Sequence, residues 1–144
     1  MSKAWSRIAA CMVVVACAVA SAQAQTAAPA VKNRIVMQVS DSDPAKWNLA
    51  LNNARNLQAD LGRDQVDIEL VVYGPGIGML KRESAVRSRI DEAMTSGVNV
   101  LACENTMTGQ KLTKSDMLPG IGYVKAGVVE IMQKQQQGYA YLRP

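Results

Sequence analysis

Short apolar runs rich in β-branched residues alternate along this chain with longer segments of helical periodicity. We expect strands at residues 33–40, 66–73 and 98–102. Between them, apolar side chains recur every three or four residues from Trp47 to Leu61 and again from Val86 to Met94, which indicates two amphipathic helices. The order strand, helix, strand, helix, strand is typical of a parallel sheet with helices on both faces. The pattern therefore predicts an α/β fold.

Residues that favour helix ends stand at the borders of both helical segments. Asp43 and Pro44 favour the start of the first helix, and Gly62 favours its end. Ser84 is the expected N-cap of the second helix, which we expect to end at Gly97. Both helices therefore have defined boundaries before any tertiary contact is considered.

The last third of the chain carries shorter elements. We expect a polar loop at residues 104–113, and a capping box at residues 113–116 that Pro119 and Gly120 limit to about one helical turn. Residues 122–124 and 139–142 favour two more short strands, and the helix expected between these strands ends at Gly138. Five strands are thus expected in all.

The N-terminus has the three parts of a signal peptide. Lys3 and Arg7 form a basic segment, residues 8–20 are apolar, and residues 22–24 (Ala-Gln-Ala) form a small-residue cleavage site. The apolar run is shorter than the about 20 residues that a bilayer span requires. We therefore expect a signal peptide at residues 1–24, a flexible Ala/Pro-rich lead at 25–32, and one domain at 33–144, with a periplasmic location and no membrane span in the mature chain.

A second processing site is an alternative. Residues 14–17 end in Cys17 and fit the pattern cut by the lipoprotein signal peptidase. Cleavage there would leave Cys17 lipidated and the protein tethered to a membrane. The mass of the mature N-terminus distinguishes the two outcomes.

Composition excludes several classes of function. The chain has no histidine. Without an imidazole, neither a Ser-His-Asp triad nor a Cys-His pair can be built, and zinc sites that require histidine are excluded as well. The glycine-rich segment at residues 74–78 (GPGIG) lacks the Lys-Ser/Thr of a P-loop and the spacing of a dinucleotide-binding loop. We expect no metal and no cofactor, and the sequence leaves open whether the protein is an enzyme.

Composition also argues against nucleic acid as a partner. Removal of Lys3 and Arg7 with the signal leaves fourteen basic residues against twelve acidic ones. The basic residues are scattered, and the mature chain has no Phe and a single Trp, whereas binding to single strands needs a basic stripe with stacking aromatic residues. We therefore expect no binding to nucleic acid.

Cys103 is the only cysteine that remains after removal of the leader, so it cannot form an internal disulfide. It follows the third expected strand, and it is either a reactive thiol or a small apolar residue buried at the top of that strand. Glu104 beside it would raise the pKa of the thiol, whereas Lys111 and Lys114 would lower it if they folded back. The sequence leaves both interpretations open.

Ligands of open parallel sheets bind beyond the carboxyl ends of the strands. Two segments reach that edge here: the glycine-rich segment after the second strand, and Cys103 with the residues that follow it. Cys103 is the candidate catalytic residue, and the candidate ligand-binding residues around it are Gly74, Gly76, Gly78, Asn105 and Thr106. Asp41 and Asp43 end the first strand at the same edge, where Asp43 is needed as a helix cap.

Three segments resemble the DsrE-like family, and most closely its exported, little-characterised branch. They are residues 71–80 (VVYGPGIGML), 97–110 (GVNVLACENTMTGQ) and 136–144 (QQGYAYLRP), and the similarity extends from Asn33 to the last residue. The resemblance implies a three-layer α/β/α domain with a mainly parallel five-stranded sheet. It also implies self-association as a trimer or hexamer.

The family also suggests a function. In its better-understood members, a cysteine at the end of the third strand accepts a sulfane sulfur as a persulfide and passes it to a partner, and Cys103 occupies the matching place. The resemblance therefore implies a sulfur carrier or sulfurtransferase with a donor or acceptor protein as partner. The alternative is a non-catalytic, homo-oligomeric binding module in which Cys103 is structural.

Overall fold

The computed structural model describes residues 32–144. The expected signal peptide, its two candidate cleavage sites and most of the Ala/Pro-rich lead lie outside the described residues. The described part carries the elements predicted for the domain. None of the helices in residues 32–144 is long and apolar enough to cross a bilayer.

Five strands form one sheet in the order β4-β3-β2-β1-β5, and every neighbouring pair is parallel. The strands are β1 (Asn33–Val39), β2 (Val66–Val72), β3 (Asn99–Cys103), β4 (Gly122–Val124) and β5 (Ala140–Leu142). The mainly parallel, five-stranded α/β prediction is therefore confirmed. The third strand is shifted by one residue from the prediction, so that Cys103 is its last residue rather than the residue after it.

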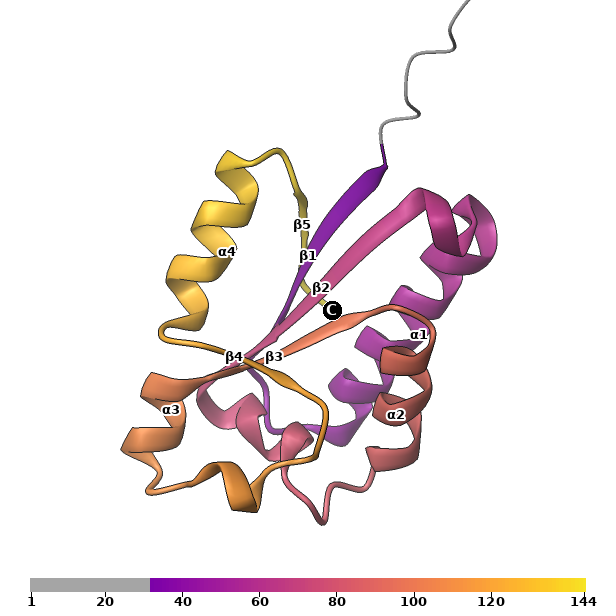
Figure 1. Ribbon diagram of the computed structural model, residues 1–144. Coiled ribbons are helices and arrows are strands. Elements are labelled where there is room, and N and C mark those ends of the chain that lie inside the picture. The colour runs from indigo at the N-terminus through magenta and orange to yellow at the C-terminus, as the bar shows by residue number, and fades with distance from the viewer. Residues whose placement is uncertain (1–31) are drawn as a thin grey trace, which may run out of the picture.

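Helices cover both faces of this sheet (Figure 1). On one face lie α1 (Pro44–Leu61) and α2 (Arg87–Thr95), and on the other lies α4 (Gly127–Gln136). The short helix α3 (Glu104–Gly109) continues directly from β3. Three short 3₁₀ helices, η1 (Arg63–Gln65), η2 (Gly74–Leu80) and η3 (Lys114–Asp116), complete the connections.

The larger core lies between the sheet and the α1/α2 pair. Buried side chains of alternate strand positions, such as Met37 and Leu70, meet Trp47 of α1 and Ile90 of α2 there. The core under α4 is smaller and is centred on Val36, Val71 and Ile131. Because neighbouring residues of a strand point to opposite faces, residues 36, 71 and 103 share the α4 face. The two faces are therefore covered unequally.

Three local predictions were wrong, all where a helix begins. Residues 74–78 are the first part of η2 rather than a loop, and residues 104–109 are α3 rather than a polar loop. Ser84 is not the N-cap of α2: that position is Val86, and the Ser84 hydroxyl accepts a hydrogen bond from the Val86 amide at 3.4 Å. The chain needs one more turn between η2 and α2 than the sequence pattern suggested, so the helix starts later.

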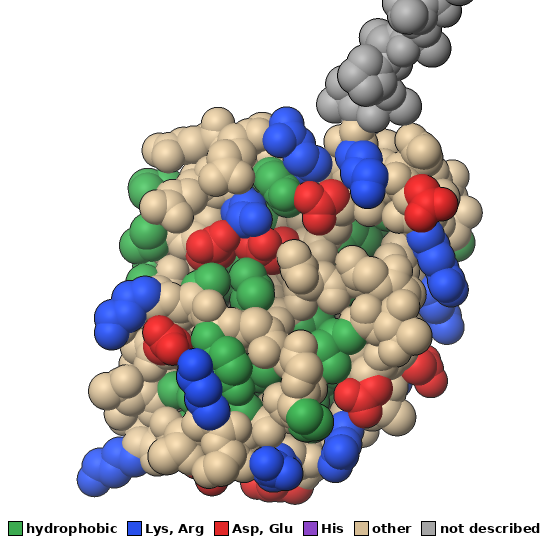
Figure 2. All heavy atoms as spheres, in the orientation of Figure 1, with side chains coloured by type: hydrophobic (Ala, Val, Ile, Leu, Met, Phe, Trp, Pro, Cys, Tyr) green, Lys and Arg blue, Asp and Glu red, His purple; other side chains and the backbone are tan. Residues whose placement is uncertain are grey.

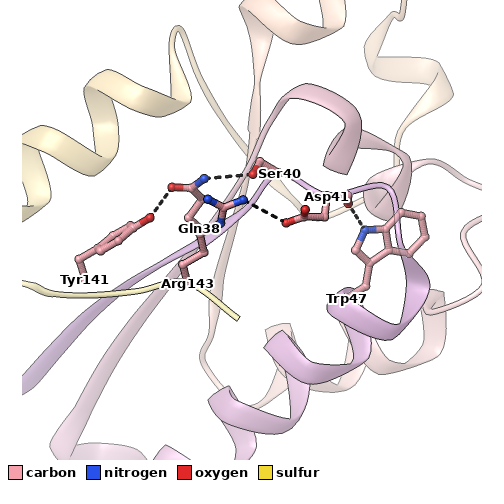
Figure 3. Close-up of polar contacts among 6 residues, drawn as sticks. All are labelled: Gln38, Ser40, Asp41, Trp47, Tyr141 and Arg143. Atoms are coloured by element: carbon pink, nitrogen blue, oxygen red, sulfur yellow. Dashed lines mark hydrogen bonds and ion pairs between the residues drawn. The ribbon is translucent and has the colours of Figure 1, made fainter.

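The C-terminal residues are tied to the carboxyl end of β1 (Figure 3). The Tyr141 hydroxyl donates a hydrogen bond to Gln38 at 2.5 Å, and the Gln38 amide donates to the Ser40 hydroxyl at 3.0 Å. The guanidinium of Arg143 lies 3.6 Å from the Asp41 carboxylate. These side-chain contacts supplement the parallel pairing of β5 with β1. They hold the end of the chain at the carboxyl edge of the sheet.

Candidate functional site

Cys103 joins a strand to a helix. It is the last residue of β3 and the N-cap of α3, with extended backbone angles (φ −80°, ψ 114°). The first amides of a helix have no partner within the helix, so the side chain at the N-cap is close to unpaired N–H donors. The local fold therefore places the thiol where α3 presents partial positive charge.

A second helix begins at the same thiol. The backbone N–H of Gly127, the first residue of α4, donates to Cys103 Sγ at an N–S distance of 3.3 Å. The carbonyl oxygen of Lys125 lies 4.0 Å from the sulfur, and it also accepts a hydrogen bond from the Asn105 amide at 3.1 Å. The segment before α4 thus holds the start of α3 and the sulfur together.

Opposing effects act on the pKa of Cys103. Burial raises the pKa because it removes water from the thiolate. Hydrogen bonds from the Thr106 side chain and from the amides of Gly127, Thr106 and Asn105 lower it. Together these hydrogen bonds outweigh the effect of burial, and the pKa of Cys103 lies below the ordinary value for a cysteine. The site favours a thiolate through dipoles and not through a neighbouring lysine.

The lysines that could have contributed lie elsewhere. Lys114 pairs with Glu104 at 3.8 Å and its ammonium lies 4.4 Å from the centre of the Tyr123 ring. Lys111 is exposed, just beyond α3. The condition under which Lys111 and Lys114 would lower the pKa of the thiol is therefore not met, and hydrogen bonds from Thr106, Gly127 and Asn105 lower that pKa.

The thiol is nearly covered: Cys103 is 5% exposed. Tyr73 is half-buried beside it, because Val72 of β2 is paired with Ala102 of β3 and the next residue of each strand points to the α4 face. Burial raises the pKa of Tyr73, and negative charge on Tyr141 or Cys103 would raise it further. Tyr73 therefore stays protonated at neutral pH, as a phenol close to the thiol.

The structure brings some of the predicted ligand-binding residues together. The Gly74 amide donates to Thr106 Oγ1 at 2.9 Å, and Gln110 Nε2 donates to the Gly74 carbonyl at 3.2 Å. The end of β2 and the end of β3 therefore meet beside Cys103, as expected for adjacent parallel strands. The Asn105 side chain is exposed at the start of α3.

The other two glycines lie against different parts of the fold. A Cβ on Gly76 would come within 2.6 Å of the Val39 carbonyl oxygen, and one on Gly78 would be 3.4 Å from the Trp47 ring. These glycines allow η2 to pack on β1 and α1. A role for Gly76 and Gly78 in ligand binding stays a prediction.

The two carboxylates at the end of β1 have separate partners. Asp43 caps α1 by accepting a hydrogen bond from the Ala45 amide at 2.8 Å, and Asp41 pairs with Arg143. Within residues 32–144, no group of three or more Cys, Asp or Glu residues is placed to hold a metal ion. The donors near Cys103 suit a thiolate, with no set of metal ligands beside it.

One residue of the site, Gly127, had no clear signal in the sequence. Gly127 precedes the apolar residues that define the last helix, and only its amide contacts the sulfur. A Cβ at this position would lie 3.1–3.2 Å from Tyr73 and 3.2 Å from Val71. A glycine directly before a helical pattern is the one feature that could have pointed to it.

Comparison with known proteins assigns the family. Residues 33–144 match the model of the DsrE/DsrF-like family. The chain belongs to this family. A search of curated proteins found no match.

Solved structures share this DsrE-like fold. MTH1491 from Methanobacterium thermoautotrophicum, described as a protein of unknown function, is 35% identical with a TM-score of 0.75, covering 78% of this chain and all of its own. BT1422 from Bacteroides thetaiotaomicron, also described as of unknown function, is 15% identical with a TM-score of 0.63, and the match covers 78% of this chain and 95% of BT1422. YchN from E. coli is 15% identical with a TM-score of 0.62, and the match covers 79% of this chain and 99% of YchN. The last two show the fold alone.

Proposed function

We propose that this DsrE-like protein is a sulfur carrier or sulfurtransferase that holds a persulfide on Cys103. Membership of a family linked to sulfur relay supports this class of function. The observation that carries it is the hydrogen bond from the Gly127 amide to Cys103 Sγ, at 3.3 Å, at the meeting point of two helix starts. Amides directed at the sulfur stabilise a thiolate, and the thiolate is the form that attacks a sulfane sulfur.

The proposed transfer is balanced without an external oxidant. The Cys103 thiolate attacks the outer sulfur of a donor persulfide, a new S–S bond forms, and the donor leaves as a thiolate. An acceptor thiolate then attacks the outer sulfur on Cys103 and releases the Cys103 thiolate. The same amides stabilise Cys103 as the attacking group in the first step and as the leaving group in the second.

The test is incubation of the folded protein with a small persulfide, followed by measurement of its intact mass. We expect a mass gain of one sulfur atom that a thiol reductant reverses and that Cys103→Ser abolishes. At neutral pH, Cys103 should also react with iodoacetamide faster than a free thiol does, because more of it is thiolate. A protein that gains no sulfur and is alkylated only after unfolding would contradict the proposal.

Burial favours the second candidate function. With 5% exposure, Cys103 also suits a structural role in a non-catalytic binding module. The two candidates differ in what Cys103→Ala does. In the binding module this change alters stability alone, whereas in the carrier it removes sulfur uptake from a protein that still folds.

Self-association is part of the proposal. The outer side of α4 exposes Val128, Val129 and Met132, with Val128 58% exposed. Figure 2 shows hydrophobic side chains at the left margin, where α4 lies in Figure 1. Burial of this surface against other copies would be favourable.

We expect analytical ultracentrifugation to show a trimer or hexamer. Val128→Ser with Met132→Gln should dissociate it, whereas Leu49→Gln, a matched change on α1, should not. A monomeric unaltered protein would contradict it.

Export is proposed from the N-terminal sequence alone. Expression of the whole gene should yield a periplasmic protein that begins at Gln25, as the mass of the mature N-terminus would show. A lipid-modified Cys17 would instead identify a membrane-tethered protein. A protein that is found in the cytoplasm and still begins at Met1 would contradict both outcomes.

A further inference from the structure

A groove between α1 and α2 lies far from the cysteine site. Its volume is about 550 Å³, which is within the range of small-molecule sites. It lies on the face of the sheet opposite α4, and it reaches η1 and Val98 at the amino ends of β2 and β3. Cys103 lies at the carboxyl edge on the other face. The groove is therefore a separate feature, and nothing in the proposed sulfur transfer uses it.

The floor of the groove is mainly apolar, and its polar groups, on Gln58 and Ser96, hydrogen-bond to each other. Leu51, Ala54 and Val98 are each at most 4% exposed. Gln58 donates to the Ser96 carbonyl at 2.8 Å and accepts from the Ser96 hydroxyl at 2.9 Å. Because buried Gln58 and half-buried Ser96 hydrogen-bond to each other, the floor of the groove offers a ligand mainly apolar contacts.

Three arginines from three elements line the groove. They are Arg55 of α1, Arg63 of η1 and Arg89 of α2. Among the described residues, no carboxylate lies within 4.0 Å of these guanidinium groups. Arg89 donates to Asn48 and, at 2.7 Å, to Asn52, so its partners are neutral. Its orientation is fixed while its positive charge remains without a counter-charge.

Acidic residues offset only part of this charge. Asp91 and Glu92 of α2 also line the groove. Asp91 lies 3.9 Å from Arg87, which is not a lining residue, and Glu92 is exposed at the rim. The groove therefore combines a net positive rim with an apolar floor, which complements an anion that carries an apolar body.

We propose that the α1/α2 groove binds a small amphipathic anion, with its carboxylate, sulfonate or phosphate group at the arginines and its apolar body on the floor. Arg55 and Arg63 are exposed and attract the anion, and Arg89 is held in place at the α1–α2 junction. The floor side chains set the size of the apolar part. A neutral ligand of the same shape lacks the attraction of the arginines and binds more weakly.

The probe for the test is 8-anilino-1-naphthalenesulfonate, an aromatic sulfonate whose fluorescence rises in apolar sites. We expect saturable binding that weakens as salt is raised, since surface charges are screened. Arg55→Gln with Arg63→Gln should lower the affinity by about fivefold, from about 0.5 kcal/mol for each exposed charge. Arg55→Lys with Arg63→Lys keeps both charges and should stay within about twofold of the original affinity.

The exposed apolar face of α4 is the competing site for this probe. Val128→Ser with Met132→Gln removes that face and should leave the charge-dependent binding in place. Thermal unfolding of each variant shows whether it remains folded, and all four altered side chains are exposed. Affinity unchanged in the Arg→Gln pair, loss of binding in the α4 variant, or no saturable binding would each overturn the proposal.

Discussion

At the scale of single residues, the site depends on Thr106. Its hydroxyl oxygen accepts a hydrogen bond from the Gly74 amide at 2.9 Å, and its side chain and amide both lower the pKa of Cys103. Thr106 therefore links the start of η2 to the sulfur. A threonine in a polar stretch gives no hint of this in the sequence, because the link forms only when two strand ends lie side by side.

Thr106→Val should raise the pKa of Cys103, because it removes a hydrogen bond that stabilises the thiolate. Thr106→Ser keeps the hydroxyl and should leave the pKa close to its original value. The measurement is the rate of iodoacetamide reaction as a function of pH, whose midpoint reports the pKa. Equal midpoints for the Val and Ser variants would show that the hydroxyl does not act on the thiolate.

At the scale of elements, the start of α4 determines how that helix sits on the sheet. Gly127 is buried, and a Cβ there would lie 3.1–3.2 Å from atoms of Tyr73 and Val71. Such distances are closer than ordinary contact, so an added Cβ would require the side chains of Tyr73 and Val71 to shift, whereas glycine lets the helix start this near β2 without such a shift. The same close approach brings the Gly127 amide to the thiol, and packing and site geometry therefore have one cause.

Gly127→Ala should lower the free energy of unfolding by about 2 kcal/mol, since overpacking a buried position costs about 1–3 kcal/mol. It should also raise the pKa of Cys103, because α4 moves away from the sulfur. Gly109→Ala is the matched control: an added Cβ there meets nothing within 4 Å. Urea unfolding measures the first effect and the pH dependence of alkylation the second. Equal effects of the two changes would refute the packing argument.

At the scale of the whole molecule, a buried ion pair joins α4 to the centre of the sheet. Glu69 of β2 is 3% exposed, and its carboxylate lies 2.7 Å from Lys134, which also lies 3.7 Å from Glu130. Glu69 Oε1 has no hydrogen-bond partner among the described residues. Burial raises the pKa of Glu69 in spite of Lys134, which lowers it. The pair thus fixes the place of α4 at a cost in desolvation.

The raised pKa of Glu69 determines how its contribution to the stability of the fold changes with pH. A carboxyl group with a pKa above its unfolded value of about 4.3 stabilises the fold most below that value, and this contribution is lost as pH rises through the folded pKa. Removal of Lys134 raises the pKa of Glu69 further, because the positive charge is gone. The ionised carboxylate is then buried without a partner at neutral pH.

Lys134→Met should therefore lower the free energy of unfolding by about 3 kcal/mol at neutral pH and by less near about pH 4, where Glu69 is largely protonated. Glu69→Gln combined with Lys134→Met should recover most of the loss. Lys46→Met, at an exposed position of α1, should change stability by at most about 0.5 kcal/mol. Urea unfolding at both pH values is the measurement; a loss that does not depend on pH would contradict the assignment to Glu69.

Sequence patterns predicted most of the elements, including the start of α1 after β1, but not the helices that begin directly after β2 and β3 at the carboxyl edge. Apolar periodicity placed β1, β2, α1 and α4, because each element buries one face and the burial is written into its own residues. Residues 104–109 are polar and lack such a pattern, so α3 was missed. Its helical form depends on β3 ending at Cys103 and on the Lys125 carbonyl that accepts from the Asn105 amide.

The amino-acid sequence by itself determined the parallel α/β architecture, the capping of α1 by Asp43, and a single cysteine at the end of β3. These follow from local periodicity, caps and composition, which need no knowledge of distant contacts. Only the tertiary structure decided the environment of that cysteine, since Gly127 lies 24 residues further along the chain and Gly74 lies 32 residues before Thr106. Hydrogen bonds between distant segments depend on strand order and helix placement, and no local pattern encodes their distances.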